Sequence, residues 1–357
     1  MIFNSFQLSE VCSRLSSGKS ITSKQISDSG SYPVYGGNGR RGYTDTKNFS
    51  GECVIIGRQG AFCGNVRYFS GDAYMSEHAI VVCANEKANT RYLAYLLSTM
   101  NLGRLSTQSA QPGLSVKTLQ KQIVKLPSVS EQTRIADFLS SFDDKIETNN
   151  KIIKTLEEIS SLIYRKIIQN PIKIIPLCEF CYIKNEKEKS ENIDIETYLS
   201  TENILPYKMG TKLASSIPDY GSVTKYSKGD TLISNIRPYF QKIAFADCNG
   251  CCSNDVICFS PKTRTLCSFL YFTLWQDSFF DFMMKGSKGT KMPRGDKQHI
   301  IKYEIPIPNN ESINQFINFA DESLANISNL RNENKTLGQI RDLALSKLMS
   351  GEIELNS

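Results

Sequence analysis

The amino-acid sequence predicts an α+β fold in which two pseudo-repeated globular domains are separated by two long antiparallel coiled-coil helices. Three observations lead to this prediction. The two halves have matching residues at a nearly constant offset. Each half ends in a long run of heptad-spaced apolar residues. The remainder alternates short β-branched runs with Gly, Asn and Ser clusters. We therefore expect globular domains at residues 1–127 and 171–308, and helices at residues 128–170 and 309–357.

The size and composition of the chain are those of a soluble protein with more than one domain. It has 357 residues, of which 40% are hydrophobic and 22% charged. No segment reaches the ~18 consecutive apolar residues that a membrane span needs. Residues 1–19 lack the cationic start, apolar core and cleavage site of an export signal, so we expect a cytoplasmic protein. The net charge of +6 is mildly basic and does not by itself identify a polyanionic partner.

The internal repeat is carried by the framework of the globular domains. Ile56 and Val66, which flank a short loop, align with Ile233 and Ile243 at an offset of 177 residues. Further matches are Ser76 with Ser253, Ile80 with Ile257, residues 92–97 with 269–274 and, at an offset of 169, Leu8, Glu10 and Cys12 with Leu177, Glu179 and Cys181. Several matches at one offset are much rarer by chance than a single match, so we infer a duplication.

Within residues 1–127 the pattern is that of short strands joined by exposed turns. The β-branched and aromatic runs lie at residues 31–35, 52–56, 65–69 and 78–82. Helical spacing near residues 91–100 and 114–122 makes the domain α+β and not all-β. Residues 171–308 have the same rhythm.

The first long helix has a defined beginning and end. Ser128 and Glu131 form the Ser-x-x-Glu pattern of a capping box, and Asn170-Pro171 ends the helical pattern. The residues between follow alternating spacings of four and three, as in a coiled-coil seam. The seam positions are Ile135, Leu139, Phe142, Ile146, Asn149, Ile153, Leu156, Ser160, Ile163 and Ile167.

The second long helix keeps the same register at an offset of 181 residues and ends before Gly351, which fits a C′ glycine. Its seam positions are Phe316, Ala320, Ser323, Ile327, Leu330, Asn334, Leu337, Arg341, Ala344 and Leu348. A single heptad stripe is more often a helix packed on its own domain, but two matched helices favour an antiparallel pair about a pseudo-twofold axis. Full overlap of the helices would place Ile135 opposite Leu348, Ile146 opposite Leu337 and Asn149 near Asn334.

The loops between the strands carry side chains suited to nucleic acid. Arg and Gln pair bidentately with guanine and adenine, and glycine-rich hairpins let the backbone approach phosphates. The candidates in the first domain are Asn38, Arg40 and Arg41, then Arg58 and Gln59, then Gln108 and Gln111. Those in the second are Asn235, Arg237 and Tyr239, then Lys288, Lys291 and Arg294. The alternative for any one loop is an ordinary solvated loop, but unlike side chains on a matched framework indicate two different reading faces.

The cysteines do not form a convincing metal or disulfide pattern. Eleven cysteines scattered through a chain without an export signal fit reduced thiols. Cys178 and Cys181 form a C-x-x-C pair, with Cys248, Cys251 and Cys252 as conceivable zinc partners. Zinc ribbons usually place the second pair ~15–20 residues away, much nearer than here, so we predict no metal site.

No catalytic motif is complete. Residues 18–20 lack the upstream glycine of a P-loop, and residues 36–39 break the dinucleotide-binding spacing. The chain has only two histidines, His78 and His299, and it lacks the Asn/Asp-Pro-Pro-aromatic loop of an amino-methyltransferase. Residues 143–145 have the residue types of a nuclease motif, Asp-Asp-Lys. Because they lie on the predicted long helix, we expect them to form a solvated face. We predict that the chain has no catalytic site.

Because of these features the chain resembles, over its whole length, the specificity subunit of a type I restriction-modification system. The resemblance is carried by residues 32–39, 56–66 and 126–136, the last leading into 142–146. The second domain departs from the pattern, because it lacks the Gly-Gly-Asn-Gly hairpin and residues 307–311 keep only part of the text that precedes the first helix.

The resemblance implies that residues 1–127 and 171–308 are target-recognition domains that each read one half of a split site in double-stranded DNA, with the helices as a spacer. It implies two copies of an N6-adenine methyltransferase subunit as partners, together with restriction subunits that translocate and cleave DNA. S-adenosylmethionine, ATP and Mg²⁺ are then expected on partner subunits, and no cofactor on this chain. The alternatives are a stand-alone enzyme with an unrecognised site and a structural adaptor that binds only proteins.

Overall fold

The chain forms two compact units, and its two longest helices run through both. The computed structural model describes residues 2–106 and 113–355. Unit 1 consists of Met1–Glu147 and Asn334–Ser357, and unit 2 of Thr148–Glu333. Each unit combines sheets with helices, so the predicted α+β class is confirmed. None of the helices in the described ranges is long and apolar enough to cross a membrane.

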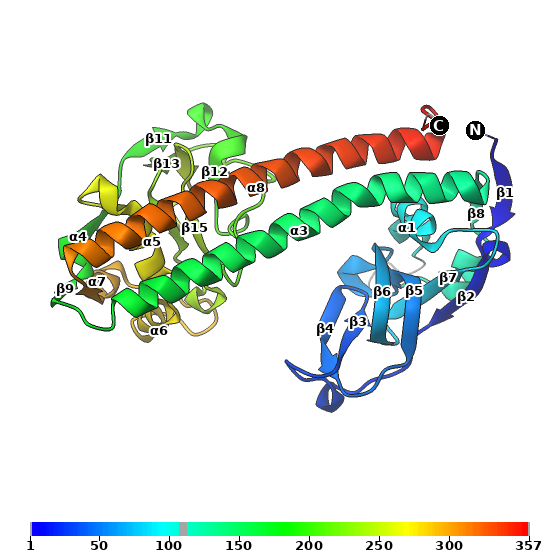
Figure 1. Cartoon of the computed structure of the whole chain (residues 1–357), viewed down its shortest axis with the longest axis horizontal. Coiled ribbons are helices and arrows are strands. Elements are labelled where there is room, and N and C mark those ends of the chain that lie inside the picture. Colours follow the sequence, from blue (N-terminus) through cyan, green and yellow to red (C-terminus); the bar gives the residue numbers. More distant parts are fainter. Residues whose placement is uncertain (1, 107–112, 356–357) are drawn as a thin grey trace. The chain divides into compact units, whose positions relative to one another are not determined.

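Unit 1 is built around a six-stranded sheet. Its strands are β1 (Asn4–Gln7), β2 (Cys12–Ser17), β3 (Tyr32–Gly36), β4 (Gly39–Thr44), β5 (Phe49–Gly57), β6 (Val66–Met75), β7 (Ala79–Ala84) and β8 (Ile123–Leu126), and its short helices are α1 (Thr90–Thr99) and α2 (Val116–Gln120). The sheet has the order β2-β7-β5-β6-β3-β4, and β1 pairs separately with β8 (Figure 1).

The central strand of unit 1 is buried on both faces, which explains the continuous apolar run in β5. On one face Val54 and Ile56 belong to the hydrophobic cluster that contains α1. On the other face Cys53 and Ile55 form a second cluster. Helix α1 begins at Asn89, whose side chain accepts a hydrogen bond from the third residue of the helix at 2.9 Å.

Unit 2 contains two four-stranded sheets. Its strands are β9 (Lys173–Pro176), β10 (Cys181–Ile183), β11 (Lys187–Lys189), β12 (Tyr198–Leu199), β13 (Ser222–Tyr226), β14 (Thr231–Ser234), β15 (Ile243–Phe245), β16 (Gly250–Cys252), β17 (Val256–Pro261) and β18 (Glu304–Ile307), and its short helices are α4 (Leu177–Phe180), α5 (Cys267–Leu274), α6 (Asp277–Lys285) and α7 (Lys297–Ile300). The sheet orders are β10-β17-β14-β15 and β11-β13-β16-β12, and β9 pairs with β18 as β1 pairs with β8.

The strand register of unit 2 repeats that of unit 1. Ile56 pairs with Ile80 across β5 and β7, and Ile233 pairs with Ile257 across β14 and β17. Strand β3 runs parallel to the end of β6, and β12 runs parallel to β16 in the equivalent register. These pairings confirm the duplication inferred from the sequence.

One strand of the repeat is divided in unit 2. The stretch that forms the single strand β5 in unit 1 corresponds in unit 2 to both β13 and β14. Between them Gly229 has a φ of 89°, and the Asp230 N–H donates to the Ser227 carbonyl at 3.0 Å. A turn therefore interrupts the strand at the position where unit 1 has Cys53.

Asp230 is fully buried at this turn and accepts hydrogen bonds from several side chains. Its Oδ1 accepts from Arg264 Nη1 at 2.6 Å and from Ser260 Oγ at 2.8 Å, and Lys184 Nζ lies 3.3 Å from its Oδ2. Burial raises the pKa of this carboxyl, but the hydrogen bonds from the Ser227 backbone and from Arg264 outweigh burial, and the net shift is downward.

Helix α3 (Val129–Ile167) lies within the predicted range and begins at the predicted cap. The Glu131 N–H donates to Ser128 Oγ at 3.3 Å, and the Ser128 N–H donates to Glu131 Oε2 at 3.2 Å. This reciprocal pair confirms the capping box.

Helix α8 (Asn310–Ser350) is the second long helix. Asn309 caps it by accepting a hydrogen bond from the Ser312 N–H at 2.8 Å. Gly351 follows the last residue with a φ of 75°, which confirms the predicted C′ glycine.

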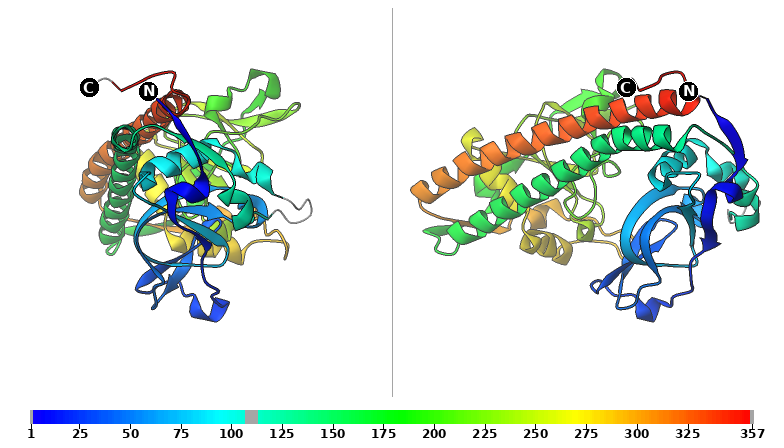
Figure 2. Two further views of the ribbon diagram at one scale, coloured as in Figure 1. Left: turned by 90° about the vertical axis from the view of Figure 1, so that its right-hand side faces the viewer. Right: turned by 45° about the vertical axis from the view of Figure 1, so that its right-hand side comes forward.

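In each unit a segment of α3 lies beside a segment of α8 and runs in the opposite direction (Figure 2). All the predicted seam positions on the two helices are buried or partly buried. In unit 1, Ile135 and Leu348, which were predicted to lie opposite each other, belong to the same hydrophobic cluster. Ile146 and Leu337, also in unit 1, are both partly buried.

The helix segments of unit 2 add polar contacts. Asn149 Nδ2 donates to Glu333 Oε2 at 2.7 Å, so Asn149 contacts the residue before its predicted neighbour Asn334. Further along, Arg331 Nη2 lies 2.8 Å from Glu157 Oε1. Burial raises the pKa of Glu157 to about 7, although Arg331 opposes this shift.

The long helices also pack on the cores of their own units. In unit 2 the rings of Tyr164 and Phe316 lie 5.3 and 6.2 Å from the ring of Phe269 on α5. Tyr164 Oη donates to Thr273 Oγ1 at 2.9 Å in the same core. Each long helix therefore packs on its own domain, which was the alternative prediction, and also pairs with the other long helix.

Candidate nucleic-acid interface

Two candidate loops of unit 1 meet at the end of β5. The hairpin of β3 and β4 turns through Gly37 and Asn38, followed by Gly39 with a φ of 95°. A Cβ on Gly37 would lie 3.2 Å from the Gly57 Cα, and one on Gly57 would lie 2.2 Å from the Phe62 carbonyl oxygen. The glycine at each position leaves room for the hairpin tip to lie close to the loop that follows β5.

The hairpin tip presents basic side chains. Asn38, Arg40 and Arg41 are exposed. The Arg40 guanidinium lies 4.9 Å from the centre of the Tyr43 ring, and its Nη1 donates to Tyr43 Oη at 2.7 Å. Arg67 of β6, which the sequence prediction omitted, is exposed and lies beside the tip. Its position depends on the pairing of β6 with β3, which nothing in its local sequence indicates.

Arg58 and Gln59 follow β5 and differ in exposure. Arg58 is partly buried: its backbone N–H donates to the His78 carbonyl at 3.0 Å, and its Nη1 donates to the Glu77 carbonyl at 3.3 Å. Gln59 is exposed, and its Oε1 lies 3.2 Å from His78 Nδ1. Arg58 is thus partly tied to the framework, whereas Gln59 faces solvent beside His78.

The residues just after the third candidate loop of unit 1 lie beside the loop that follows β5. Gln108 and Gln111 lie outside the described residues. Gly113, just after them, forms a β-bridge with Gln59, and the next residue donates its N–H to the Arg58 carbonyl at 2.8 Å. The end of this loop therefore lies against the loop that follows β5.

The candidate loops of unit 2 meet in the same way at the end of β14. The Asn235 N–H donates to the Asp255 carbonyl at 2.8 Å, and the Gly295 N–H donates to the Asn235 carbonyl at 3.1 Å. These two bonds occupy the same places in the repeat as the two backbone bonds of Arg58. In addition, the Arg237 N–H donates to the Pro293 carbonyl at 2.8 Å.

The predicted side chains of unit 2 also divide by exposure. Asn235 and Arg237 are partly buried, whereas Tyr239, Lys288, Lys291 and Arg294 are exposed. Lys288 Nζ lies 2.7 Å from Asp296 Oδ2, and its hydrogen bond lowers the pKa of that carboxyl. Arg294 Nη2 lies 3.4 Å from Asp255 Oδ1. The basic loop is therefore partly neutralised by two local carboxylates.

Backbone strain is concentrated beside the unit 2 loop. Five non-glycine residues in the described ranges have positive φ, and four of them are Tyr207, Lys208, Arg237 and Gln241. Two backbone hydrogen bonds link the first two of these residues to the segment that contains the other two. The Tyr207 N–H donates to the Phe240 carbonyl at 2.7 Å, and the Lys208 N–H donates to the Gln241 carbonyl at 3.1 Å. Such conformations cost ~1–3 kcal/mol each and concentrate at functional sites.

The described part of the chain was predicted to hold no metal site, and its His, Cys, Asp and Glu side chains bear on that prediction. Among the residues that the structure describes, no group of three or more His, Cys, Asp or Glu side chains could hold a metal ion. Cys181 and Cys252 lie in different sheets of unit 2. Asp143 is not the solvated side chain that the sequence suggested, because it accepts hydrogen bonds from Tyr95 and Arg341 in unit 1.

A duplicated α+β unit that presents unlike polar loops from one framework, together with two long helices, is the architecture of a two-part recognition protein. The model of a protein family described as type I restriction modification DNA specificity domain matches residues 3–158 and 172–334. The chain belongs to this family.

Individual relatives agree with this assignment. The chain is 38% identical over 158 residues to the type I restriction enzyme EcoprrI specificity subunit of Escherichia coli, an alignment that covers 44% of this chain and only 37% of that protein. It is 23% identical over 296 residues to a Mycoplasma pneumoniae protein described as a type I specificity subunit, covering 78% and 79% of the two chains. The crystal structure of a type I S subunit from M. genitalium shares the fold, with a TM-score of 0.66 at 16% identity over 98% of this chain and 96% of that one.

Proposed function

We propose that the chain reads a bipartite sequence in double-stranded DNA and directs partner methyltransferase and restriction subunits to it. The observation that carries the proposal is the matched pair of loop sites. Equivalent backbone hydrogen bonds anchor Arg58 in unit 1 and Asn235 in unit 2, yet the exposed side chains around them differ. A common framework with unlike side chains supports the reading of two different half-sites by one chain.

The exposed side chains have the chemistry that this reading needs. Arg and Gln donate or accept in pairs that match the major-groove edges of guanine and adenine, and Lys and Arg also neutralise phosphates. We assign DNA contacts to Asn38, Arg40, Arg41, Arg58, Gln59, Gln108, Gln111, Asn235, Arg237, Tyr239, Lys288, Lys291 and Arg294. Because Arg58, Asn235 and Arg237 are partly buried, their share of these contacts is smaller than that of the exposed residues.

In this proposal the chain is not an enzyme. Its loop sites hold hydrogen-bonding and cationic side chains but, in the described ranges, no carboxylate or thiol cluster for a metal. S-adenosylmethionine, ATP and Mg²⁺ then belong to the partner subunits, which carry out methylation, translocation and cleavage.

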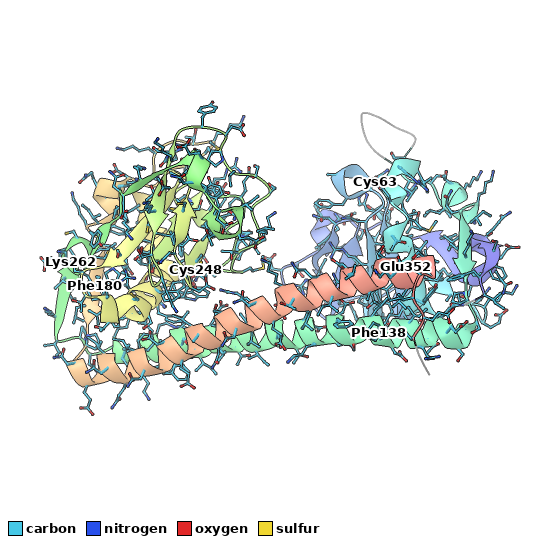
Figure 3. The ribbon with its side chains drawn as sticks, turned by 90° about the horizontal axis from the view of Figure 1, so that it is seen from above. Cys63, Phe138, Phe180, Cys248, Lys262 and Glu352 are labelled. Atoms are coloured by element: carbon cyan, nitrogen blue, oxygen red, sulfur yellow. The ribbon has the colours of Figure 1, made fainter. Side chains whose placement is uncertain are left out.

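Two copies of one methyltransferase subunit are proposed as partners, because exposed apolar pairs recur at matching positions of the repeat. Ile159 and Leu162 of α3, in unit 2, are 40% and 57% exposed. Ile340 and Leu343 of α8, in unit 1, occupy the same register positions and are 46% and 63% exposed. Phe138, labelled on α3 in Figure 3, adds an exposed aromatic ring in unit 1. One equivalent apolar site in each unit fits two copies of the same partner.

The division of labour along the chain is part of the same proposal. Residues 1–127 and 171–308 would be the target-recognition domains, and residues 128–170 and 309–357 the spacer. The continuity of α3 and α8 through both units supports a spacer role, since a long helix has a fixed rise of 1.5 Å per residue.

The proposal is tested by producing the chain together with its methyltransferase subunit and mapping N6-methyladenine across a host genome. We expect a single two-part motif with a fixed unread gap, and binding of the purified complex to duplexes of that motif that weakens steeply with salt. Methylation without a two-part motif would contradict the proposal. A complex that forms but shows no salt-dependent DNA binding would support the adaptor alternative instead, and turnover by the chain alone would support an enzyme.

A further inference from the structure

The residue before β7 and its equivalent before β17 hold the two loop sites through their backbones. The His78 carbonyl accepts from the Arg58 N–H at 3.0 Å, and the Asp255 carbonyl accepts from the Asn235 N–H at 2.8 Å. His78 and Asp255 are related by the same offset as the paired strands on either side. They are therefore one position of the shared framework.

The side chains at this position contact an exposed candidate side chain in each unit. His78 Nδ1 lies 3.2 Å from Gln59 Oε1, and Asp255 Oδ1 lies 3.4 Å from Arg294 Nη2. An imidazole can hydrogen-bond an amide in either of its orientations, whereas a carboxylate only accepts and suits a guanidinium. The two contacted side chains come from different loops, Gln59 from the loop that follows β5 and Arg294 from the basic loop, and each faces a framework side chain of suitable chemistry.

The segment that carries this position is itself tethered in both units. In unit 1 the His78 Nε2 lies 3.2 Å from Glu77 Oε1, and the other oxygen of Glu77 accepts from the Ile21 N–H at 3.3 Å. In unit 2 the residue before Asp255 is Asn254, whose Oδ1 accepts from Lys187 Nζ at 2.7 Å. A tethered segment can hold a neighbouring side chain in one orientation.

We propose that His78 and Asp255 are positioning residues that set the base preference of the two half-sites, His78 by orienting Gln59 and Asp255 by orienting Arg294. This inference rests on the proposed reading function. It adds residues that act on DNA through the side chains that they orient. A Gln or Arg side chain discriminates between bases only when both of its hydrogen bonds meet the base edge. A side chain that loses its support keeps its contacts with DNA but loses selectivity.

The test uses the chain in complex with its methyltransferase subunits. Methylation motifs are mapped, and binding is measured to duplexes in which each base pair of the motif is replaced in turn. For His78→Ala we expect discrimination to fall about tenfold at one position of one half-site. For Asp255→Ala we expect the same loss in the other half-site. Affinity for the best duplex and the unfolding temperature of the complex should change little, because both side chains are partly exposed.

Conservative variants separate positioning from a general structural effect. His78→Asn and Asp255→Asn keep a hydrogen-bonding group near Gln59 and Arg294 and should restore most of the lost discrimination. Relaxation of both half-sites by one alanine variant, or a uniform loss of affinity for all duplexes, would overturn the inference. An unchanged motif in both alanine variants would overturn it while leaving the proposed function intact. A wild-type complex with no two-part motif would overturn both.

Discussion

Among single residues, Asp230 shows how a buried charge is maintained in unit 2. Its two carboxylate oxygens are occupied by Lys184, Ser260 and Arg264. Asp230→Asn removes the charge and leaves Lys184, which is largely buried, facing a neutral amide. We expect the free energy of unfolding to fall by about 2–4 kcal/mol in chemical denaturation. The loss is at the lower end for a broken buried pair because Arg264 is half exposed.

The matched control is Asp219→Asn, an exposed carboxylate for which we expect a change within about 0.5 kcal/mol. The difference between wild type and Asp230→Asn should also depend on pH. Because the pKa of Asp230 is lowered on folding, its contribution is present above the ordinary pKa of an aspartate and is lost as the pH falls. An Asp230→Asn variant as stable as wild type at pH 7 would contradict this account.

Glu157 has the opposite dependence on pH. Its pKa is raised to about 7 by burial, so the folded chain holds this proton more tightly than the unfolded chain does. Its contribution to stability is complete below the ordinary glutamate pKa of ~4.3 and is lost as the pH rises through 7. We expect wild type to lose stability relative to Glu157→Gln between pH 5 and pH 7.5.

Thermal unfolding at several pH values measures this difference. The control is Glu158→Gln, the exposed neighbour on α3, which should run parallel to wild type over the same pH range. Parallel curves for Glu157→Gln as well would show that Glu157 keeps an ordinary pKa in the folded chain.

For the candidate side chains, the sequence indicated turns and loops but not the residues that support them. Gln59 could be predicted because it follows an apolar strand run, and Tyr43 lies in the same hairpin as Arg40. His78 depends on a contact across the sheet, which leaves no periodic pattern in the sequence. The strained backbone of Arg237 was also unpredictable, since its side chain gives no sign of a positive φ.

At the scale of elements, the exposed pairs on the two long helices make separable predictions. Ile159→Asp with Leu162→Asp places two charges on the apolar site of unit 2, and Ile340→Asp with Leu343→Asp does so in unit 1. Each double variant should retain one methyltransferase subunit, and the combination should retain none, because a buried unpaired carboxylate opposes association. Native mass spectrometry of the co-purified complexes measures the number of copies.

The control for the docking prediction is Ile152→Asp on α3. Ile152 is as exposed as Ile159, but the matching position on α8 is Glu333, so it is not part of the repeated apolar pair. This variant should retain two copies. Two copies retained by all the double variants would place the docking surface elsewhere.

The long helices were the elements that the sequence predicted best, because the heptad pattern of α3 lies between a capping box and a proline, and that of α8 ends before a glycine. The division of one repeat strand into β13 and β14 was not predicted. Gly229 and Asp230 are residue types common in turns, but the buried network of Asp230 that accompanies this turn involves residues far away in sequence.

At the scale of the whole molecule, the spacer proposal predicts how helix length alters the DNA site. One heptad inserted after Glu147 in α3 and one after Glu333 in α8 adds ~10 Å to each helix. Because B-DNA rises 3.4 Å per base pair, the unread gap of the motif should lengthen by about three base pairs. Both half-site sequences should stay the same in a methylation map.

The same seven residues inserted at the exposed loop position Asp219 serve as the control and should leave the gap unchanged. A gap that does not lengthen after the helix insertions would remove the helices from the spacing function. Altered half-site sequences would show that the insertions disturb the loop sites.

In the proposed function each target-recognition domain reads its own half-site independently of the other. The most direct measurement is the methylation motif of a complex in which residues 1–127 are exchanged for the equivalent domain of a family member with a different known motif. We expect one half-site to become that of the donor, while the other half-site and the length of the gap stay as in wild type. A motif in which both half-sites change, or in which neither changes, would contradict it.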